Sequence, residues 1–295
     1  MTTRWLAIAV LLGACASDPE PAPADPGTPD EGTVTLKTTA FTLAPGEEVT
    51  KCQWFRNPLG ADLEIASFES HQSPVSHHMF LTPAPTGDAP IRDCLPGVSA
   101  SETILYGSQL PEYQLTFPEG VAVLAPGEEG LRIQIHAFNS TEAPATVEVE
   151  IVLHLAEAGT VTDHAGVLIF ANQDFTIPAG PTPTLITKTC TAPIDLNVVA
   201  STSHMHRRGI EFSATTTDGA ELYHSTGWSE PPMKVFDPPL QLAAGQEVTW
   251  TCTFQNDTDE PIGFGLSADT DEMCNFQTRV YPVPTLSTGS FVLCP

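Results

Sequence analysis

The sequence predicts an all-β protein. Segments in which apolar and polar residues alternate recur along the chain, and this alternation is typical of strands with one buried face. The 28 prolines and 21 glycines leave no room for long helices. Beyond the N-terminal segment, no stretch shows the spacing of apolar positions that a surface helix requires.

The N-terminal segment predicts export. Arg4 precedes the apolar run Trp5–Leu12, which is too short to span a bilayer. Leu12-Gly13-Ala14-Cys15 is typical of a bacterial lipobox, so we expect residues 1–14 to be a signal peptide and Cys15 to be lipidated. The alternative is an ordinary signal peptide with a stray cysteine. We expect an exported protein, anchored to a bacterial membrane only through Cys15 and facing the periplasm or the cell surface.

Residues 15–33 are expected to form a disordered tether. Proline, aspartate, glutamate, glycine and alanine dominate this stretch, which has few large apolar residues. Such a composition cannot bury a core.

Strands are expected from residue 34 onward. In the first half the clearest alternation lies in Glu48–Phe55, Leu131–His136 and Thr146–Leu153, with turns at Pro45-Gly46, Pro96-Gly97 and Pro126-Gly127.

The proline-rich segment Ile177–Pro183 is the best candidate for a domain boundary. We therefore expect two all-β halves, residues 34–180 and 181–295, whose similar sizes favour two β-sandwiches. The strand pattern restarts after the boundary in Leu185–Cys190, Leu196–Ser203, Ile210–Thr216, Glu247–Phe254 and Gly263–Ala268.

The charge balance excludes some classes of partner. The chain has 36 acidic and 11 basic residues, which gives a net charge of −25. This excess of negative charge argues against nucleic acid or an anionic membrane surface as a partner.

Cysteine usage predicts disulfides. If Cys15 of the seven cysteines carries lipid, an even number remains, and in an exported chain this indicates three disulfides. Spacing alone does not choose the pairing. Thiolate metal ligands are less favoured, because the chain has no Cys-X-X-Cys motif. The six cysteines are Cys52, Cys94, Cys190, Cys252, Cys274 and Cys294.

Two histidines and a methionine in the second half suggest a metal site. On a strand, His204 and His206 point to the same face and Met205 points to the other. A thioether from far along the chain could complete the site, and Met273 is the candidate. Sulfur beside imidazole favours copper, the Cu(I) state in particular.

A second set of histidines lies upstream. His136 ends the alternating segment Leu131–His136, and His77 and His78 are adjacent. Adjacent residues on a regular strand face opposite ways, so His77 and His78 can share a metal only at a strand end or a bulge.

These motifs together resemble the copper type II, ascorbate-dependent monooxygenases, the family of peptidylglycine alpha-hydroxylating monooxygenase and dopamine beta-monooxygenase. The resemblance covers roughly residues 51–295. It implies two jelly-roll-like β-sandwich domains that face each other across a solvent-filled cleft, each with one copper site. The motifs that match in order are His77-His78-Met79, Gln134-Ile135-His136, His204-Met205-His206 and Glu272-Met273-Cys274-Asn275.

The resemblance also implies roles and pairings. Two coppers per chain are expected, an electron-transfer copper on His77, His78 and His136, and an oxygen-binding copper on the catalytic residues His204, His206 and Met273. The implied disulfides are Cys52–Cys94, Cys190–Cys294 and Cys252–Cys274.

The implied activity is hydroxylation of a C–H bond in a small organic substrate. Dioxygen and ascorbate, or another one-electron reductant, would be cosubstrates. Gln134 matches a family glutamine that orients a histidine, and Asn275 matches a substrate-binding position. The peptide-hydroxylating member has an arginine and a tyrosine where this chain has Thr202 and Gln277, so the resemblance does not extend to a peptidylglycine substrate. Arg207 could instead meet an anionic group.

Two other functions fit parts of the pattern. A non-catalytic copper-binding lipoprotein for copper buffering or delivery would need the same ligands. A zinc hydrolase is disfavoured by the methionine. The histidines without a family counterpart are His71, His154, His164 and His224, and the methionines expected to serve packing are Met79, Met205 and Met233.

Overall fold

The structure, a computed structural model, describes residues 32–99 and 101–294. Within these ranges it contains 23 strands and no helix, so the all-β prediction is confirmed. None of the described segments is a helix long and apolar enough to cross a membrane. The expected signal peptide, the lipidation site Cys15 and nearly all of the expected tether lie outside the described residues.

The strands of the first half cover most of residues 33–155. They are β1 (Thr33–Lys37), β2 (Phe41–Leu43), β3 (Glu48–Phe55), β4 (Leu63–Gln72), β5 (Ser76–Ala84), β6 (Ala89–Asp93), β7 (Tyr106–Ser108), β8 (Glu112–Thr116), β9 (Val121–Ala125), β10 (Gly130–Phe138), β11 (Ala145–Val147) and β12 (Val149–Leu155).

The strands of the second half cover most of residues 163–293. They are β13 (Asp163–Asn172), β14 (Thr176–Ile177), β15 (Gly180–Thr191), β16 (Leu196–His204), β17 (Gly209–Thr216), β18 (Glu221–Thr226), β19 (Lys234–Leu242), β20 (Glu247–Asn256), β21 (Ile262–Gly263), β22 (Cys274–Tyr281) and β23 (Phe291–Leu293).

The first half packs two sheets around one core. A five-stranded sheet has the order β6-β3-β10-β5-β7, and β1-β12-β4-β9 form part of a larger sheet, with β8 paired to β4. Apolar residues on the inner faces of both sheets form a single buried cluster, which includes Leu36, Ile65, Leu81, Ile133 and Leu153.

The second half repeats this arrangement. The four-stranded sheet β15-β20-β17-β18 faces the strands β13-β22-β16-β19. Aromatic side chains fill the space between them, and the cluster includes Phe170, Phe212, Trp250, Phe254 and Phe276.

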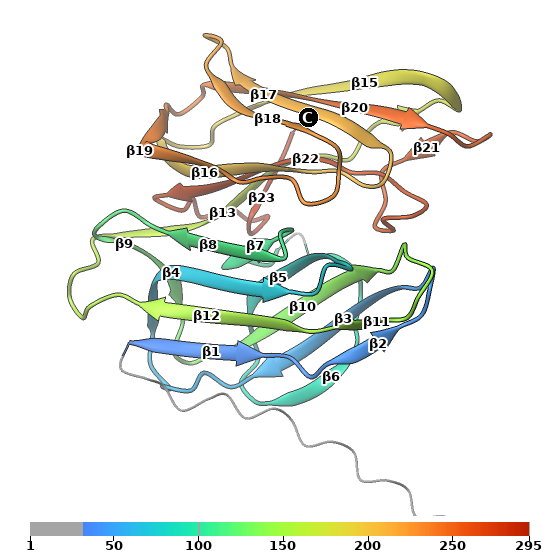
Figure 1. Cartoon of the computed structure of the whole chain (residues 1–295). Coiled ribbons are helices and arrows are strands. Elements are labelled where there is room, and N and C mark those ends of the chain that lie inside the picture. Colours follow the sequence, from blue (N-terminus) through green and yellow to red (C-terminus); the bar gives the residue numbers. More distant parts are fainter. Residues whose placement is uncertain (1–31, 100, 295) are drawn as a thin grey trace, which may run out of the picture.

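One sheet runs through both halves. β9 and β13 pair in parallel, with Asp163 opposite Val121 and Ala165 opposite Val123. This pairing joins the first-half strands to β13-β22-β16-β19 in one ten-stranded sheet (Figure 1). The two sandwiches therefore share a sheet, and the expected division into two domains stays a prediction.

Strand pairing also bears on the expected boundary at residues 180 and 181. That position falls at the start of β15, and β13 pairs with β22 and β23 of the second half. Residues 163–172, which the sequence pattern places in the first half, thus lie in the sheet of the second.

The strand predictions differ in outcome. The alternating segments in β3, β10, β16, β17 and β20 are confirmed. The strand expected at Gly263–Ala268 is wrong, since the strand is only Ile262–Gly263, paired with Thr176–Ile177, and Phe264 adds an isolated bridge to Glu272. The strand β22 was not predicted from the sequence, because seven of its eight residues are buried and its apolar and polar positions therefore do not alternate.

The three expected disulfides are confirmed. Their Cα–Cα distances are 5.8 Å for Cys52–Cys94, 5.5 Å for Cys190–Cys294 and 5.9 Å for Cys252–Cys274. The last one ties β20 to β22, which belong to the two facing sheets of the second half.

Candidate metal centre

A β-bulge brings the adjacent histidines of β5 together. His136 on β10 lies opposite His78, and the next residue, Ala137, lies opposite Ser76, so His77 is the extra residue. A bulge re-aims the side chain of the extra residue. As a result the rings of His77 and His78 are 5.2 Å apart, and both are within 5.4 Å of the His136 ring, measured between centroids. The structure thus has the bulge that a shared site requires.

The His-X-His pair lies at the end of β16. His204 is its last residue, and His206 follows in the turn to β17, with the two ring centroids 5.3 Å apart. Met205 points the other way into the core of the second half, as predicted. Gly209 closes the turn, and a Cβ there would lie 2.7 Å from the Met205 Cβ.

A buried carboxylate fixes this turn. Glu272 is fully buried and accepts hydrogen bonds from the backbone N–H groups of His206 (2.9 Å) and Arg208 (2.8 Å). Burial raises the pKa of Glu272 to about 7, although these hydrogen bonds oppose the shift. Glu272 directly precedes Met273, so it links the turn of the His-X-His pair to the methionine.

The two histidine sets form one buried cluster. The centroid of the His77 ring lies 4.9 Å from that of His204 and 5.3 Å from that of His206. Within each of two groups, His77–His78–His136 and His77–His204–His206, the ligand atoms lie within 4.8 Å of one another. His77 belongs to both groups. The most exposed of the five rings is 8% exposed. The expected solvent-filled cleft between the sets is therefore absent among the described residues.

Side chains from each half hold histidines or loops of the other. The Nδ1–H of His204 donates to Gln109 Oε1 (2.6 Å), and Gln109 Nε2 donates to the carbonyl oxygen of Ser203 (2.7 Å). Gln109 follows β7 in the first half, whereas His204 and Ser203 end β16 in the second. This pair of contacts leaves Nε2 of His204 available as a ligand atom.

Glu48 makes a second set of contacts between the halves. It accepts hydrogen bonds from His136 Nε2–H (2.7 Å), the Ser267 hydroxyl (2.7 Å) and the Ala268 N–H (2.6 Å). Burial opposes ionisation of Glu48, but these hydrogen bonds outweigh it and lower its pKa to about 2. The remaining nitrogen of His136, Nδ1, lies 3.4 Å from Nε2 of His78.

Four of the histidines, His77, His78, His204 and His206, are neutral near pH 7. Burial, and then the neighbouring imidazoles, lower the pKa values of His77, His78 and His204 well below the ordinary value. Burial lowers the pKa of His206 to about 4. Neutral imidazole is the form that binds metals.

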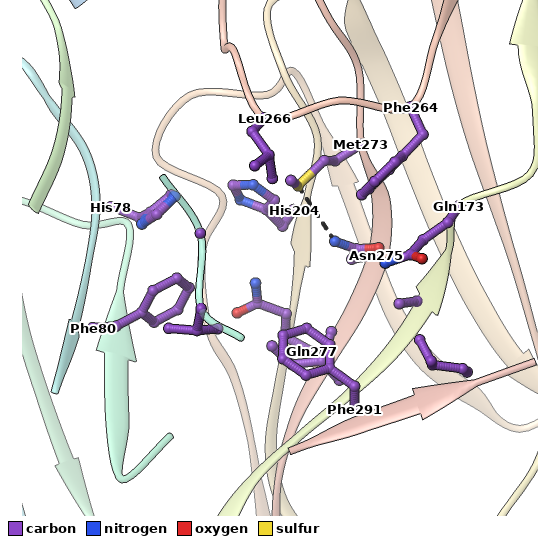
Figure 2. Close-up of a pocket in the computed structure, with 15 residues that line it drawn as sticks. His78, Phe80, Gln173, His204, Phe264, Leu266, Met273, Asn275, Gln277 and Phe291 are labelled. Atoms are coloured by element: carbon purple, nitrogen blue, oxygen red, sulfur yellow. Dashed lines mark hydrogen bonds between the residues drawn. The ribbon is translucent and has the colours of Figure 1, made fainter. Parts of the chain in front are cut away.

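An apolar cavity of about 100 Å³ lies next to the cluster (Figure 2). His78, His204 and Met273 line it, and Figure 2 shows the Met273 sulfur directed toward the His204 ring. Asn275 Nδ2 donates to that sulfur at 3.5 Å. The other polar lining side chains are amides, and most of the wall is apolar: Phe80, Val98, Ile169, Ala171, Phe264, Leu266 and Phe291.

The structure places the remaining predicted site residues differently. Gln134 donates to the carbonyl oxygens of Leu95 (3.2 Å) and Gly97 (2.8 Å), and thus holds a loop beside the cavity rather than a histidine. Arg207 is 42% exposed and pairs with Asp269, away from the residues that line the cavity. Asn275 lies in the cavity wall, as its position next to Met273 suggests.

Glu48, Gln109 and Glu272 are functional candidates that the sequence analysis did not find. Each acts on a histidine that is at least 66 residues away in the sequence. Only Glu272, beside Met273 in a matching motif, carried a signal that could have singled it out.

The buried donors fit a metal ion such as copper. His77 Nε2, His78 Nδ1 and His206 Nε2 are buried and have no hydrogen-bond partner among the described residues. Unpaired buried polar atoms are costly, and metal ions bound by the two groups of histidines would satisfy these nitrogens. The Nδ1–H of His206 donates to the Asp271 carbonyl oxygen at 3.2 Å, which fixes Nε2 as its free nitrogen. Imidazoles with a thioether are typical copper ligands.

Comparison with known families identifies the second half of the chain. Residues 163–290 match the family model for the copper type II ascorbate-dependent monooxygenase, C-terminal domain. The resemblance that the sequence motifs predicted is thereby confirmed for this part of the chain. Among curated proteins, none matches the sequence significantly.

Solved structures show only remote similarity. The major capsid protein P2 of bacteriophage PM2 is 9% identical, with 84% of this chain and 97% of that chain covered and a TM-score of 0.32. A cupin 2 conserved barrel domain protein from Leptotrichia buccalis is 9% identical, with 88% and 97% covered and a TM-score of 0.18. At these TM-scores the similarity supports no conclusion about fold or function.

Proposed function

We propose, on the premise that residues 163–290 match the C-terminal domain of copper type II ascorbate-dependent monooxygenases, that this protein is a copper-dependent monooxygenase. It hydroxylates a C–H bond of a small organic substrate with dioxygen and an external reductant such as ascorbate. One observation carries the proposal: five buried histidines from both halves meet beside an apolar cavity that also contains the Met273 thioether.

The ligand sets follow the family pattern. His77, His78 and His136 hold an electron-transfer copper, and His204, His206 and Met273 hold the copper that meets dioxygen. Bound copper would supply one-electron transfer and the activation of dioxygen. The unpartnered nitrogens of His77, His78 and His206 support this assignment, because each of them needs a partner.

The chain's own residues prepare the site in three ways. Gln109, the Asp271 carbonyl and Glu48 each accept one ring N–H, which leaves the other nitrogen of that ring free to bind metal. Burial of the five rings excludes bulk water, and it keeps the imidazoles of His77, His78, His204 and His206 neutral. The apolar cavity next to His204 and Met273 holds the substrate close to the metal ligands.

The cavity favours an enzyme over a protein that only buffers or delivers copper. A copper carrier needs ligands but no chamber beside them. Here aromatic and aliphatic side chains enclose a space that His78, His204 and Met273 open onto. Such a chamber is typical of a small-molecule site.

Export and lipidation belong to the same proposal. Three disulfides are typical of exported proteins. We propose that the mature chain is anchored to a bacterial membrane through Cys15 and that its partners are a small-molecule substrate and dioxygen, with no nucleic acid.

The proposal is tested with copper-loaded protein, ascorbate and isotopically labelled dioxygen. A metabolite extract should yield a product heavier by one labelled oxygen atom, with oxygen uptake that depends on ascorbate. Met273→Leu should retain the fold and lose most of the turnover. Met79→Leu makes the same exchange at a core methionine and should keep the turnover. Copper binding without any labelled product would favour the copper carrier instead.

A further inference from the structure

A buried cation lies next to the histidine centre without a carboxylate partner. Arg279 on β22 is 2% exposed. Its Nη2 donates to the carbonyl oxygen of Gly107, and its Nε and Nη1 have no hydrogen-bond partner among the described residues. No described carboxylate pairs with it either. A buried guanidinium with two unpaired donors is costly unless an anion or water meets it.

The guanidinium is adjacent to the proposed substrate cavity. Arg279 lines a small space of about 10 Å³, which is enough for one water molecule. His78, Phe80 and Gln277 line both this space and the main cavity, so the two adjoin. Among the described residues that line them, Arg279 is the only one with a permanent charge.

A polar row on β22 connects the metal ligands to Arg279. Asn275, Gln277 and Arg279 alternate along the strand and so share one face. Asn275 pairs with His204 in the sheet, and Arg279 lies four residues further on, roughly 13 Å along the strand. The side-chain amide of Gln277 has no hydrogen-bond partner among the described residues, and Asn275 Oδ1 is buried without one. The row therefore presents the unpaired amide oxygen of Asn275, then the amide of Gln277, and then a cation.

The other walls are apolar. Phe80, Ile169, Phe264 and Phe291 enclose most of the main cavity, and Figure 2 shows the Phe264 and Phe291 rings facing it from opposite sides of Asn275. Its volume of about 100 Å³ is somewhat below the roughly 150 Å³ of a protein cavity that binds benzene. The occupant's apolar part is therefore no larger than a single ring or a short chain.

We propose that Arg279 binds the carboxylate of an acidic substrate whose apolar body occupies the cavity beside His204 and Met273. This assignment rests on the proposed function and names its substrate class, a small apolar monocarboxylate. The unpaired N–H groups of Nε and Nη1 can donate to a carboxylate, and the N–H of Nη2 that Gly107 leaves free completes a two-pronged contact with one of them. Gln277 separates the two spaces, and its free amide can move aside or donate to the same group. Arg207, the candidate from the sequence, pairs with Asp269 at the surface and does not serve this purpose.

The test compares acids with their uncharged amides. Benzoate, straight-chain alkanoates of about four to six carbons and the corresponding amides are titrated calorimetrically into the full-length protein, metal-free and copper-loaded. At least one acid should bind about tenfold more tightly than its amide, because hydrogen bonds to charged groups contribute more than neutral ones. Equal affinity of every acid and its amide, or no acid binding at all, would overturn the assignment.

Variants locate the effect. Arg279→Met should reduce the affinity of the best acid to that of its amide, and Arg279→Lys should keep part of the preference for the acid. Arg92→Met removes an exposed arginine that stacks on Trp54 and should change nothing. Persistence of the acid preference in Arg279→Met would place the anion elsewhere. If Arg279→Met does not fold, the acid–amide comparison in the parent protein and in Arg279→Lys still tests whether Arg279 binds the carboxylate.

The outcome is separable from that of the proposed function. If the metal-free protein binds an acid but the copper-loaded protein never converts one, the anion site at Arg279 is supported and the monooxygenase proposal is contradicted. If labelled product forms from neutral substrates alone, the monooxygenase proposal is supported and the anion site is contradicted.

Discussion

At the scale of single residues, Glu48 connects a proposed metal ligand to a distant loop. Its carboxylate accepts hydrogen bonds from His136, Ser267 and Ala268. Glu48→Gln weakens the acceptor for His136 and should lower copper affinity about 10–100-fold, the usual effect of losing a partner of a ligating histidine. Competition with a copper chelator measures this.

Glu128 provides the matched control for that substitution. It is exposed, and its carboxylate makes no contact with a histidine. Glu128→Gln should leave copper affinity unchanged. Equal affinities of Glu48→Gln and the parent protein would contradict the positioning role of Glu48.

His77 should differ from the other histidines, because it belongs to both groups of potential ligands. The parent protein should bind about two copper ions per chain by our assignment of two ligand sets. His77→Ala should weaken both sites, whereas His136→Ala and His206→Ala should each weaken one. Copper analysis after dialysis of the three variants tests this. Identical losses of copper in all three variants would contradict a contribution of His77 to both sites.

Sequence patterns predicted some residues of the metal centre and could not predict others. Alternation along Leu131–His136 showed which face His136 occupies, and the two-residue spacing of His204 and His206 did the same. Glu48 was beyond sequence reasoning, because its role depends on a loop more than 200 residues away. Arg279 was not predicted either, since nothing in the local sequence shows that no carboxylate lies opposite it.

At the scale of elements, the Cys252–Cys274 disulfide joins the two sheets of the second half beside Met273. Replacing both cysteines with alanine should lower the free energy of unfolding by about 2–5 kcal/mol, the usual cost of losing a disulfide in an exported domain. It should also weaken copper binding at the Met273 site, because Cys274 fixes the start of β22. Urea unfolding and copper analysis measure the two effects. Normal copper retention in a destabilised variant would show that the disulfide does not position Met273.

Two of the strands that the sequence pattern missed, β13 and β22, share a physical cause. β13 and β22 are covered on both faces, so almost every position is apolar or buried and no alternation appears. Gly263–Ala268 alternates in sequence yet leaves the sheet after Gly263, because its backbone turns toward Glu272 and Glu48. Tertiary contacts decided these cases, and local pattern could not show them.

At the scale of the whole molecule, the two sandwiches should unfold together. The ten-stranded sheet, the contact of Gln109 with His204 and the contacts of Glu48 all cross between the halves. Calorimetry should show one transition, and copper at a hundredfold excess over its dissociation constant should stabilise the folded chain by about 2.7 kcal/mol for each bound ion. Two transitions, only one of which shifts with copper, would mean that the halves unfold separately.

The burial of the five rings also determines how quickly the metal can be exchanged. Each of the five histidines is 8% exposed or less, so a chelator in solution cannot touch a histidine ligand atom until the halves separate locally. Above a threshold concentration, the rate of copper loss should therefore stop rising with chelator and report the opening rate of the protein itself. A rate that keeps rising in proportion to chelator would mean direct access to the ion. The same barrier makes the time of secretion and folding, before the halves close, the natural moment for the protein to acquire its metal.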